Sequence, residues 1–154
     1  MTFKTPVSIL VLIYTSDLEV LLLERADKSG FWQSVTGSIE PQDKSLMDTA
    51  IREVKEETGI DAMEHELTNW NVSKVYDIYP HWRYRYAPEV SQNTEHHFGL
   101  KLSKKVNVTL SPLEHTRYEW VDWKEAAKRV FSWTNVDALI YLGQIHGLEL
   151  EDNP

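Results

Sequence analysis

The segment of residues 45–57 constrains the fold most strongly, because its apolar side chains repeat at helical and not at strand intervals. Ser45 with Asp48 resembles a capping box at its start, and Gly59 is a typical stop just beyond its end. The apolar positions that lie on one face of this helix are Leu46, Met47, Ala50, Ile51 and Val54. The sequence therefore predicts an amphipathic helix that buries this face against another layer of the protein.

Shorter runs on both sides of this helix have strand-like patterns, bounded by turn residues. The expected strands are Val7–Tyr14, Glu19–Glu24, Trp32–Thr36, Leu67–Tyr79, His81–Tyr86, His96–Leu102 and Tyr118–Val121. We expect the first two to form a hairpin. Two further helices are predicted over Trp123–Phe131 and Asn135–Ile145, the second capped by Thr134 or Asn135. Strands before, between and after helices predict an α/β or α+β domain, with a mixed sheet and helices packed on its faces.

Length and composition exclude several classes of protein. The 154 residues suit a single domain over residues 1–154, and 42% hydrophobic with 26% charged residues is typical of globular proteins. A net charge of −8 argues against a protein that coats nucleic acid. The absence of cysteine excludes disulfides, a cysteine nucleophile and thiolate metal ligands. The longest apolar run, Val7–Tyr14, is far shorter than the roughly 20 residues of a membrane span, and no signal-peptide cleavage site follows it. We expect a cytoplasmic protein with no membrane or nucleic-acid partner.

Three carboxylates lie together on one ridge of the predicted helix, along the border of its apolar face. They belong to Glu53, Glu56 and Glu57, and Arg52 can pair with Glu56 one turn away. Like charges at this spacing cost roughly 0.2–0.5 kcal/mol per pair, and acids near a helix C-terminus oppose its dipole. A bound divalent cation such as Mg²⁺ or Mn²⁺ would make the cluster favourable. The alternative is a solvated acidic helix face, which is common on surface helices.

The residues around this cluster resemble the Nudix hydrolases. The run Arg52-Glu53-Val54-Lys55-Glu56-Glu57-Thr58-Gly59-Ile60 matches the second half of the Nudix pattern without a break. The first half departs from it, because Asp43 stands where the family has Glu, and eight residues instead of seven precede Arg52. The resemblance spans essentially the whole chain. It implies an α/β/α sandwich and a divalent-metal hydrolase that cleaves phosphoanhydride bonds.

Motifs outside this pattern resemble one Nudix subfamily, which acts on dihydroneopterin triphosphate in bacterial folate synthesis. They are Phe31–Ser38, Arg85–Pro88, Asn93–Glu95, Glu114-His115 and Ser132–Asn135. The resemblance implies that a pterin triphosphate is converted to the monophosphate and pyrophosphate. Two alternatives remain: a Nudix pyrophosphatase for dATP-like or oxidised purine nucleotides, and a catalytically silent Nudix domain that binds a ligand or a protein.

The resemblance also implies which residues form the site. The metal-binding and catalytic set is Glu53, Glu56, Glu57 and Glu114. The substrate-binding set is Lys4, Arg25, Thr36, Tyr76, Asp77, Ile78, Tyr79 and Ser132. Lysine and arginine can neutralise phosphate charge, and hydroxyl groups can bind phosphate or the pterin. Taken singly, each of these residues could instead occupy an ordinary surface position with no role in substrate binding.

We predict that cations held by the four glutamates reduce the charge of the triphosphate and position an activated water in line with a pyrophosphate leaving group. If residues 81–86 form a strand, His81, Arg83 and Arg85 share one face and the aromatic residues share the other. The basic face is then either a wall near the triphosphate or a solvated surface. We expect a monomer, with an oligomer left open.

Overall fold

One twisted, mixed sheet carries the site, and the computed structural model describes it together with its helices over residues 2–150. The strands are β1 (Val7–Thr15), β2 (Glu19–Arg25), β3 (Trp32–Gln33), β4 (Val35–Ser38), β5 (Glu66–Asp77), β6 (Gln92–Leu102) and β7 (His115–Asp122). The helices are α1 (Leu46–Thr58), α2 (Trp123–Arg129) and α3 (Trp133–Ile145), with short 3₁₀ helices η1 (Ala62–Glu64) and η2 (Pro80–Arg85).

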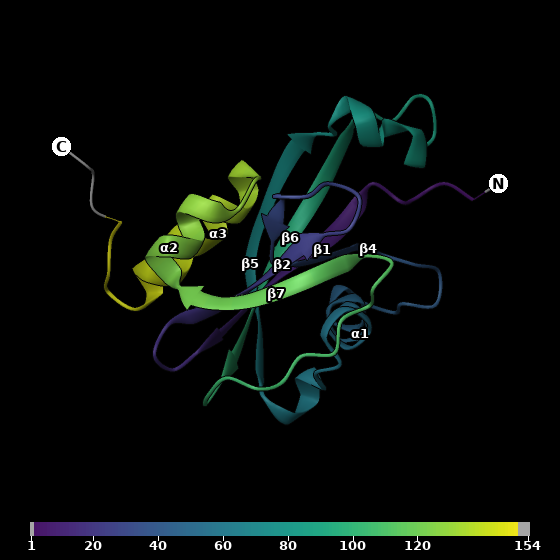
Figure 1. The fold of residues 1–154 in the computed structure, drawn as a ribbon. Coiled ribbons are helices and arrows are strands. Elements are labelled where there is room, and N and C mark those ends of the chain that lie inside the picture. The colour runs from purple at the N-terminus through teal and green to yellow at the C-terminus, as the bar shows by residue number, and fades with distance from the viewer. Residues whose placement is uncertain (1, 151–154) are drawn as a thin grey trace.

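Strand β1 lies inside the sheet, and this explains why its sequence is apolar almost throughout. The order is β3-β2-β1-β6-β5, with β4 paired to β1 and β7 paired to β2. Strands β1 and β6 are parallel, whereas the other pairs are antiparallel, including the predicted β1–β2 hairpin. Ile9 and Val11 face the layer that contains α1, and Leu10 and Leu12 face the layer of α2 and α3. Figure 1 shows α1 on the opposite side of the strands from α2 and α3, which confirms the predicted sandwich of helices around a mixed sheet.

Helix α1 begins and ends at the residues that the sequence indicated. The Ser45 side chain accepts a hydrogen bond from the Asp48 backbone N–H at 3.1 Å. Gly59 adopts a left-handed conformation with φ of 76°, and its N–H donates to the Lys55 carbonyl at 2.9 Å. A residue with a side chain is strained in this conformation, so glycine suits the position. Both ends of the helix are therefore fixed locally, which places its glutamates on a defined face.

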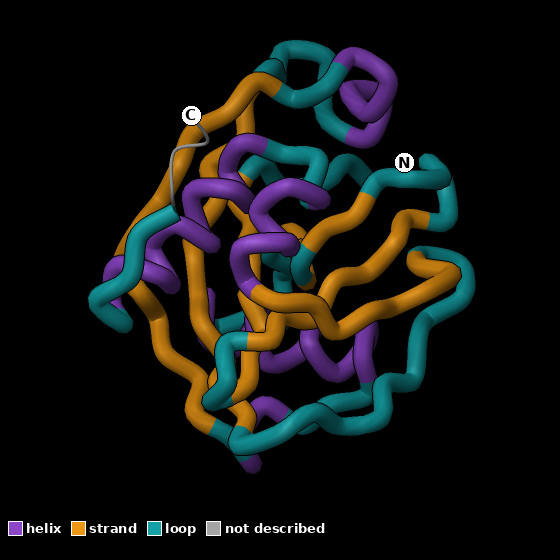
Figure 2. Tube along the Cα trace, turned by 60° about the vertical axis from the view of Figure 1, so that its left-hand side comes forward, coloured by secondary structure: helices purple, strands orange, loops and turns teal. Residues whose placement is uncertain are grey.

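The segment of residues 81–86 is not a strand, so the predicted alternation of basic and aromatic faces is wrong. Pro80 begins the 3₁₀ helix η2 there. Proline fixes a helical φ and has no N–H for a sheet hydrogen bond, and the Trp82 N–H instead donates to the Tyr79 carbonyl. Figure 2 shows this short helix and its flanking loops beyond the ends of two long strands. The segment can therefore border a cavity at that edge of the sheet.

Two smaller differences concern boundaries. The predicted strand over residues 32–36 is divided into β3, which pairs with β2, and β4, which pairs with β1. Helix α3 is capped by Ser132 and not by Thr134 or Asn135, because the Ser132 hydroxyl accepts from the Asn135 N–H at 3.2 Å.

None of the helices in the described part of the chain is long and apolar enough to cross a bilayer.

Candidate active site

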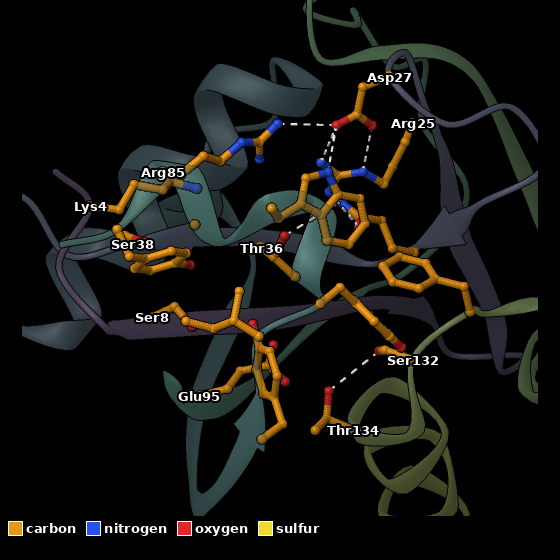
Figure 3. A pocket seen from close by; sticks show the side chains of 18 of the residues that line it. Lys4, Ser8, Arg25, Asp27, Thr36, Ser38, Arg85, Glu95, Ser132 and Thr134 are labelled. Carbon is orange, nitrogen blue, oxygen red and sulfur yellow. Dashed lines mark hydrogen bonds and ion pairs between the residues drawn. The ribbon is translucent and has the colours of Figure 1, made fainter. Parts of the chain in front are cut away.

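A pocket of about 830 Å³ lies at the edge of the sheet where segments distant in sequence meet. Its wall is built from residues 2–4, the ends of β2 and β5, strand β4, helix η2, the turn before β7 and the start of α3. This volume suits a small organic substrate. Figure 3 shows Arg25 and Asp27 on one side of the pocket, and Ser8 and Glu95 on the other.

Glu53 and Glu57 are buried much more deeply than the border position predicted for them. Their exposed fractions are 7% and 1%. Glu53 packs directly on the backbone of Gly37 in β4, and a Cβ at Gly37 would overlap the Glu53 carboxyl carbon. The glycine is therefore required by this close approach. It brings the carboxylate of α1 against the strand that lines the pocket.

Arg52 holds Glu53 in place and also explains the altered first half of the pattern. Its Nη1 donates to Glu53 Oε1 at 2.6 Å, while Nε and Nη2 donate to the two carboxylate oxygens of Asp43 at 3.0 and 2.8 Å. This fork lowers the pKa of Asp43 to about 2, chiefly through the hydrogen bonds from Arg52. Arg52 also pairs with Glu56 at 3.3 Å, as the helical spacing predicted. Asp43 thus fixes the arginine that orients Glu53.

The Glu57 carboxylate is the most unusual group in the site. Both of its oxygens are buried and have no hydrogen-bond partner among residues 2–150. Burial raises its pKa well above the ordinary range, and the charges of Glu53 and Glu114 act in the same direction. Burial likewise raises the pKa of Glu53. Two adjacent buried carboxylates are costly when both are ionised, and a divalent cation removes that cost. The orphaned oxygens of Glu57 therefore fit a metal ion that would lie against this pair.

The other two predicted metal-binding glutamates lie apart from this pair. The side chain of Glu56 is 52% exposed and points to Arg52, outside the pocket wall. Glu114 is exposed on the turn before β7 and lines the pocket. Within residues 2–150, no three carboxylate or imidazole groups converge closely enough to hold an ion by themselves. A cation at the Glu53–Glu57 pair would therefore also take ligands from water or from phosphate, as Mg²⁺ commonly does.

A chain of polar side chains connects Glu57 to Arg25. Arg25 Nη1 donates to Gln33 Oε1 at 3.1 Å, and Gln33 Nε2 lies 3.1 Å from His115 Nε2. Because the amide donates, His115 Nε2 accepts, and the ring proton resides on Nδ1, which lies 3.7 Å from Glu57 Oε1. Burial, helped by the charge of Arg25, lowers the pKa of His115 to about 4. His115 is therefore a neutral group that faces Glu57.

Cationic side chains gather on the pocket wall around one carboxylate. Asp27 accepts from Arg25 Nε at 2.8 Å, from Arg85 Nη2 at 3.1 Å and from the Trp82 indole N–H at 3.0 Å. The hydrogen bonds from Arg25 are the main cause of the strongly lowered pKa of Asp27. Lys4 is exposed as a whole residue, yet desolvation of its amine and then the charge of Arg85 lower its pKa. The wall offers three positive charges to an anionic ligand.

All eight predicted substrate-binding residues line this pocket. The wall includes Lys4, Arg25, Thr36, Tyr76, Asp77, Ile78, Tyr79 and Ser132, together with Glu57 and Glu114. Of the three basic residues predicted to share a strand face, Arg85 lines the pocket, whereas His81 and Arg83 do not. Tyr79 packs against Trp82 and Phe131, with ring centroids 5.5 and 5.9 Å away. The pocket therefore has an aromatic side as well as a cationic one.

Sequence reasoning missed several residues of the wall. They are Ser8, Asp27, Gln33, Trp82, Glu95, His115 and Phe131. Asp27 carried no local signal, since its role depends on partners elsewhere in the chain, whereas Gln33 lies within the run Phe31–Ser38 that carried part of the resemblance. Glu95 lies within the run Asn93–Glu95 that carried part of the resemblance, and this run was the signal that could have indicated it.

Comparisons with known proteins agree with this geometry. Residues 4–140 match the family described as NUDIX domain. Dihydroneopterin triphosphate diphosphatase of Escherichia coli K12 is 43% identical over 140 residues, which cover 89% of this chain and 91% of that protein. The Haemophilus influenzae enzyme of the same name is 42% identical over 142 residues, with 90% and 88% covered. The structure of the E. coli dihydroneopterin triphosphate pyrophosphohydrolase superposes with a TM-score of 0.85 at 42% identity, covering 92% of this chain and 97% of that one.

Proposed function

This chain belongs to the Nudix hydrolase family, and from that premise we infer that it hydrolyses the phosphoanhydride of 7,8-dihydroneopterin triphosphate. Water adds to one phosphorus, the P–O–P bond breaks, and the products are dihydroneopterin monophosphate and pyrophosphate. The substrate is that of relatives with 42 and 43% identity over most of both chains. The structural observation that supports the reaction best is the buried Glu53–Glu57 pair beside a pocket lined by positive charge.

We propose that the glutamate pair holds a divalent cation, Mg²⁺ with Mn²⁺ as a substitute. Glu53 and Glu57 are the inner ligands, and Glu56 and Glu114 contribute from the helix surface and from the turn before β7. Such an ion, when bound, neutralises phosphate charge and lowers the pKa of a water molecule. Two observations support this proposal: the Glu57 oxygens lack hydrogen-bond partners among the residues that the structure describes, and Arg52 donates a hydrogen bond to Glu53.

The chain's own cations act on the polyphosphate. Lys4, Arg25 and Arg85 lie on one wall and offset the charge of the phosphates, and they also stabilise the charge that develops on the pyrophosphate leaving group. Asp27 keeps Arg25 and Arg85 at fixed positions by accepting from both. Thr36 and Ser132 line the pocket, and in this proposal their hydroxyls donate to phosphate or substrate oxygens.

A substrate screen with product identification tests this function. We expect kcat/KM for dihydroneopterin triphosphate to exceed that for every deoxynucleoside triphosphate, with pyrophosphate released only when Mg²⁺ or Mn²⁺ is present. A higher kcat/KM for a purine nucleotide would favour the runner-up, a nucleotide pyrophosphatase. No pyrophosphate release from any of these compounds would favour a silent binding domain. Hydrolysis in ¹⁸O water shows which phosphorus is attacked, because the label enters one product.

We further propose that the enzyme works in the cytoplasm as a monomer, with a small-molecule triphosphate and no nucleic acid or membrane as partner. Size-exclusion chromatography with light scattering checks the oligomeric state. Cell fractionation checks the location.

A further inference from the structure

Glu95 is a buried acid in the pocket wall that the proposed hydrolysis does not use. It lies on β6, where Asn93, Glu95 and His97 alternate onto the face that carries α2 and α3. Its exposed fraction is 4%, and it nevertheless lines the pocket. In Figure 3 it lies beside Ser8, away from Arg25 and Asp27. The position is therefore distinct from the wall that faces the phosphates.

The Glu95 carboxylate lacks the partners that a buried acid requires. Among the described residues, its side-chain partner is His97, whose Nε2 lies 2.9 Å from Glu95 Oε1. No lysine or arginine of the described chain pairs with it; the neighbouring Lys74 pairs with Asp137 at 3.2 Å. A buried carboxylate with one hydrogen bond is unfavourable unless a ligand brings further donors. The remaining acceptor capacity of Glu95 faces the pocket.

Two hydroxyl groups lie next to this carboxylate and are oriented by a buried amide. Ser8 is the register partner of Glu95 across the parallel strands β1 and β6. Asn93 Nδ2 donates to Ser8 Oγ at 2.7 Å and to the Tyr76 hydroxyl oxygen at 3.1 Å. Each hydroxyl accepts from the amide and so keeps its own hydrogen for another acceptor. Ser8 and Tyr76 both line the pocket, which makes them donors beside Glu95.

We propose that Glu95, with Ser8 and Tyr76, binds the edge of a 2-amino-4-oxopyrimidine ring and so selects the heterocycle of the substrate. Such an edge presents an amino N–H, a ring N–H and a carbonyl oxygen in a row. The carboxylate accepts the two N–H donors side by side, and a hydroxyl donates to the carbonyl oxygen. An adenine-type edge presents a ring acceptor next to its amino group and leaves one Glu95 oxygen facing a lone pair. This proposal rests on the proposed function and deepens it, since dihydroneopterin carries the matching edge.

The layout of the pocket supports this selection. The cations and Glu57 occupy one part of the wall, and Glu95 occupies another, so one elongated ligand can reach both. The aromatic rings of Tyr79 and Trp82 line the same cavity and offer faces on which a flat bicycle can stack. Guanine carries the same hydrogen-bonding edge as a pterin, so the experiment must distinguish a pterin ligand from a guanine ligand.

The test compares kcat/KM for dihydroneopterin triphosphate, dGTP and dATP between the wild type and Glu95→Gln. The amide replaces one acceptor by a donor, so we expect kcat/KM for the pterin to fall by about 30-fold or more, mainly through KM, with dATP changed less than about threefold. The matched control is Glu24→Gln, because Glu24 is a buried carboxylate outside the pocket that pairs with Arg117 at 2.9 Å. It should leave the pterin-to-dATP ratio unchanged.

Equal losses on the pterin and dATP in Glu95→Gln would overturn the proposal, because they would indicate a merely structural role. A wild type that is inactive on the pterin overturns the proposed function instead, and the dGTP-to-dATP ratio then tests Glu95. The wild-type kcat/KM values for dihydroneopterin triphosphate and dGTP show whether the pterin or the guanine ring is the preferred ligand. If Glu95→Gln does not fold, Ser8→Ala takes its place: a pterin-to-dATP ratio lowered about fivefold supports the proposal, and an unchanged ratio overturns it.

Discussion

Two parts of one pocket bury carboxylates in opposite ways. At α1, Glu53 and Glu57 lie side by side; Arg52 donates to the first, while the second has no hydrogen-bond partner in the described part of the chain. On β6, Glu95 is single, and an imidazole is its side-chain partner within residues 2–150. A pair of acids needs positive charge, whereas one acid between hydroxyls needs N–H donors. The difference supports the proposals that the first region binds an ion with phosphate and that the second binds a neutral heterocycle.

The sharpest way to break this comparison is Glu57→Gln. We expect kcat to fall on the order of 10³-fold for every substrate, because the change removes a proposed ion ligand. Steady-state assays with Mg²⁺ measure it, and calorimetric titration of Mg²⁺ should show weakened binding. Glu56→Gln serves as a comparison, because the half-exposed Glu56 side chain points to Arg52. We expect kcat of this variant to fall only about tenfold. A folded Glu57→Gln protein with wild-type turnover would contradict the assignment.

Gly37→Ala should affect the same region by a steric route. The added methyl group overlaps the Glu53 carboxyl carbon, so the carboxylate must move. We expect kcat to fall about 100-fold, as for other displaced catalytic groups. Calorimetry with dihydroneopterin, which carries no phosphate, should give an unchanged Kd, because the β6 region is untouched. A parallel loss of that affinity would show that the two regions are not separable.

Asp43→Asn tests the support behind Glu53. We expect about tenfold lower kcat and about 2 kcal/mol lower unfolding free energy at pH 7, because the Arg52 fork loses its charged partner. The folded pKa of Asp43 is about 2 against an ordinary 3.8, so its stabilisation is complete above pH 3.8 and is lost as the pH falls toward 2. Urea titrations of both proteins between pH 7 and 2 should therefore converge at the acidic end. A stability difference that persists at pH 2 would refute this electrostatic account.

The smallest expected effect is that of His97→Phe, which acts on Glu95 through its hydrogen bond. We expect KM for the pterin substrate to rise about fivefold with kcat unchanged, because the carboxylate is positioned less well. His96→Phe is the matched control on the opposite face of the same strand. An equal rise of KM in both variants would show that the strand, and not the bond, is responsible.

The sequence predicted the α1 region well because its signals are local. Ser45, Gly59 and the spacing of the glutamates lie within one helix and its ends, and short-range rules read them correctly. The depth of burial of Glu57 was missed, since it depends on strands from other parts of the chain. The metal roles of the four glutamates remain predictions.

The β6 region could not be predicted in the same way. Ser8 and Glu95 are 87 residues apart and meet through the parallel register of β1 and β6, which no short-range pattern specifies. The strand predicted over residues 81–86 was wrong for a different reason. Its alternation of basic and aromatic residues is typical of a strand, but Pro80 begins a 3₁₀ helix there. Long-range pairing and a proline-initiated turn thus account for most of what the sequence left open.

The loop of residues 40–44 has a practical consequence for the search for related enzymes. Eight residues instead of the usual seven separate Asp43 in this loop from Arg52, yet both Asp43 oxygens accept from Arg52, at 3.0 and 2.8 Å. A text pattern with a fixed gap rejects this chain, whereas a geometric query for a carboxylate chelating that guanidinium accepts it. Genome surveys that filter on the rigid string will therefore undercount functional members whose entry loop has been lengthened.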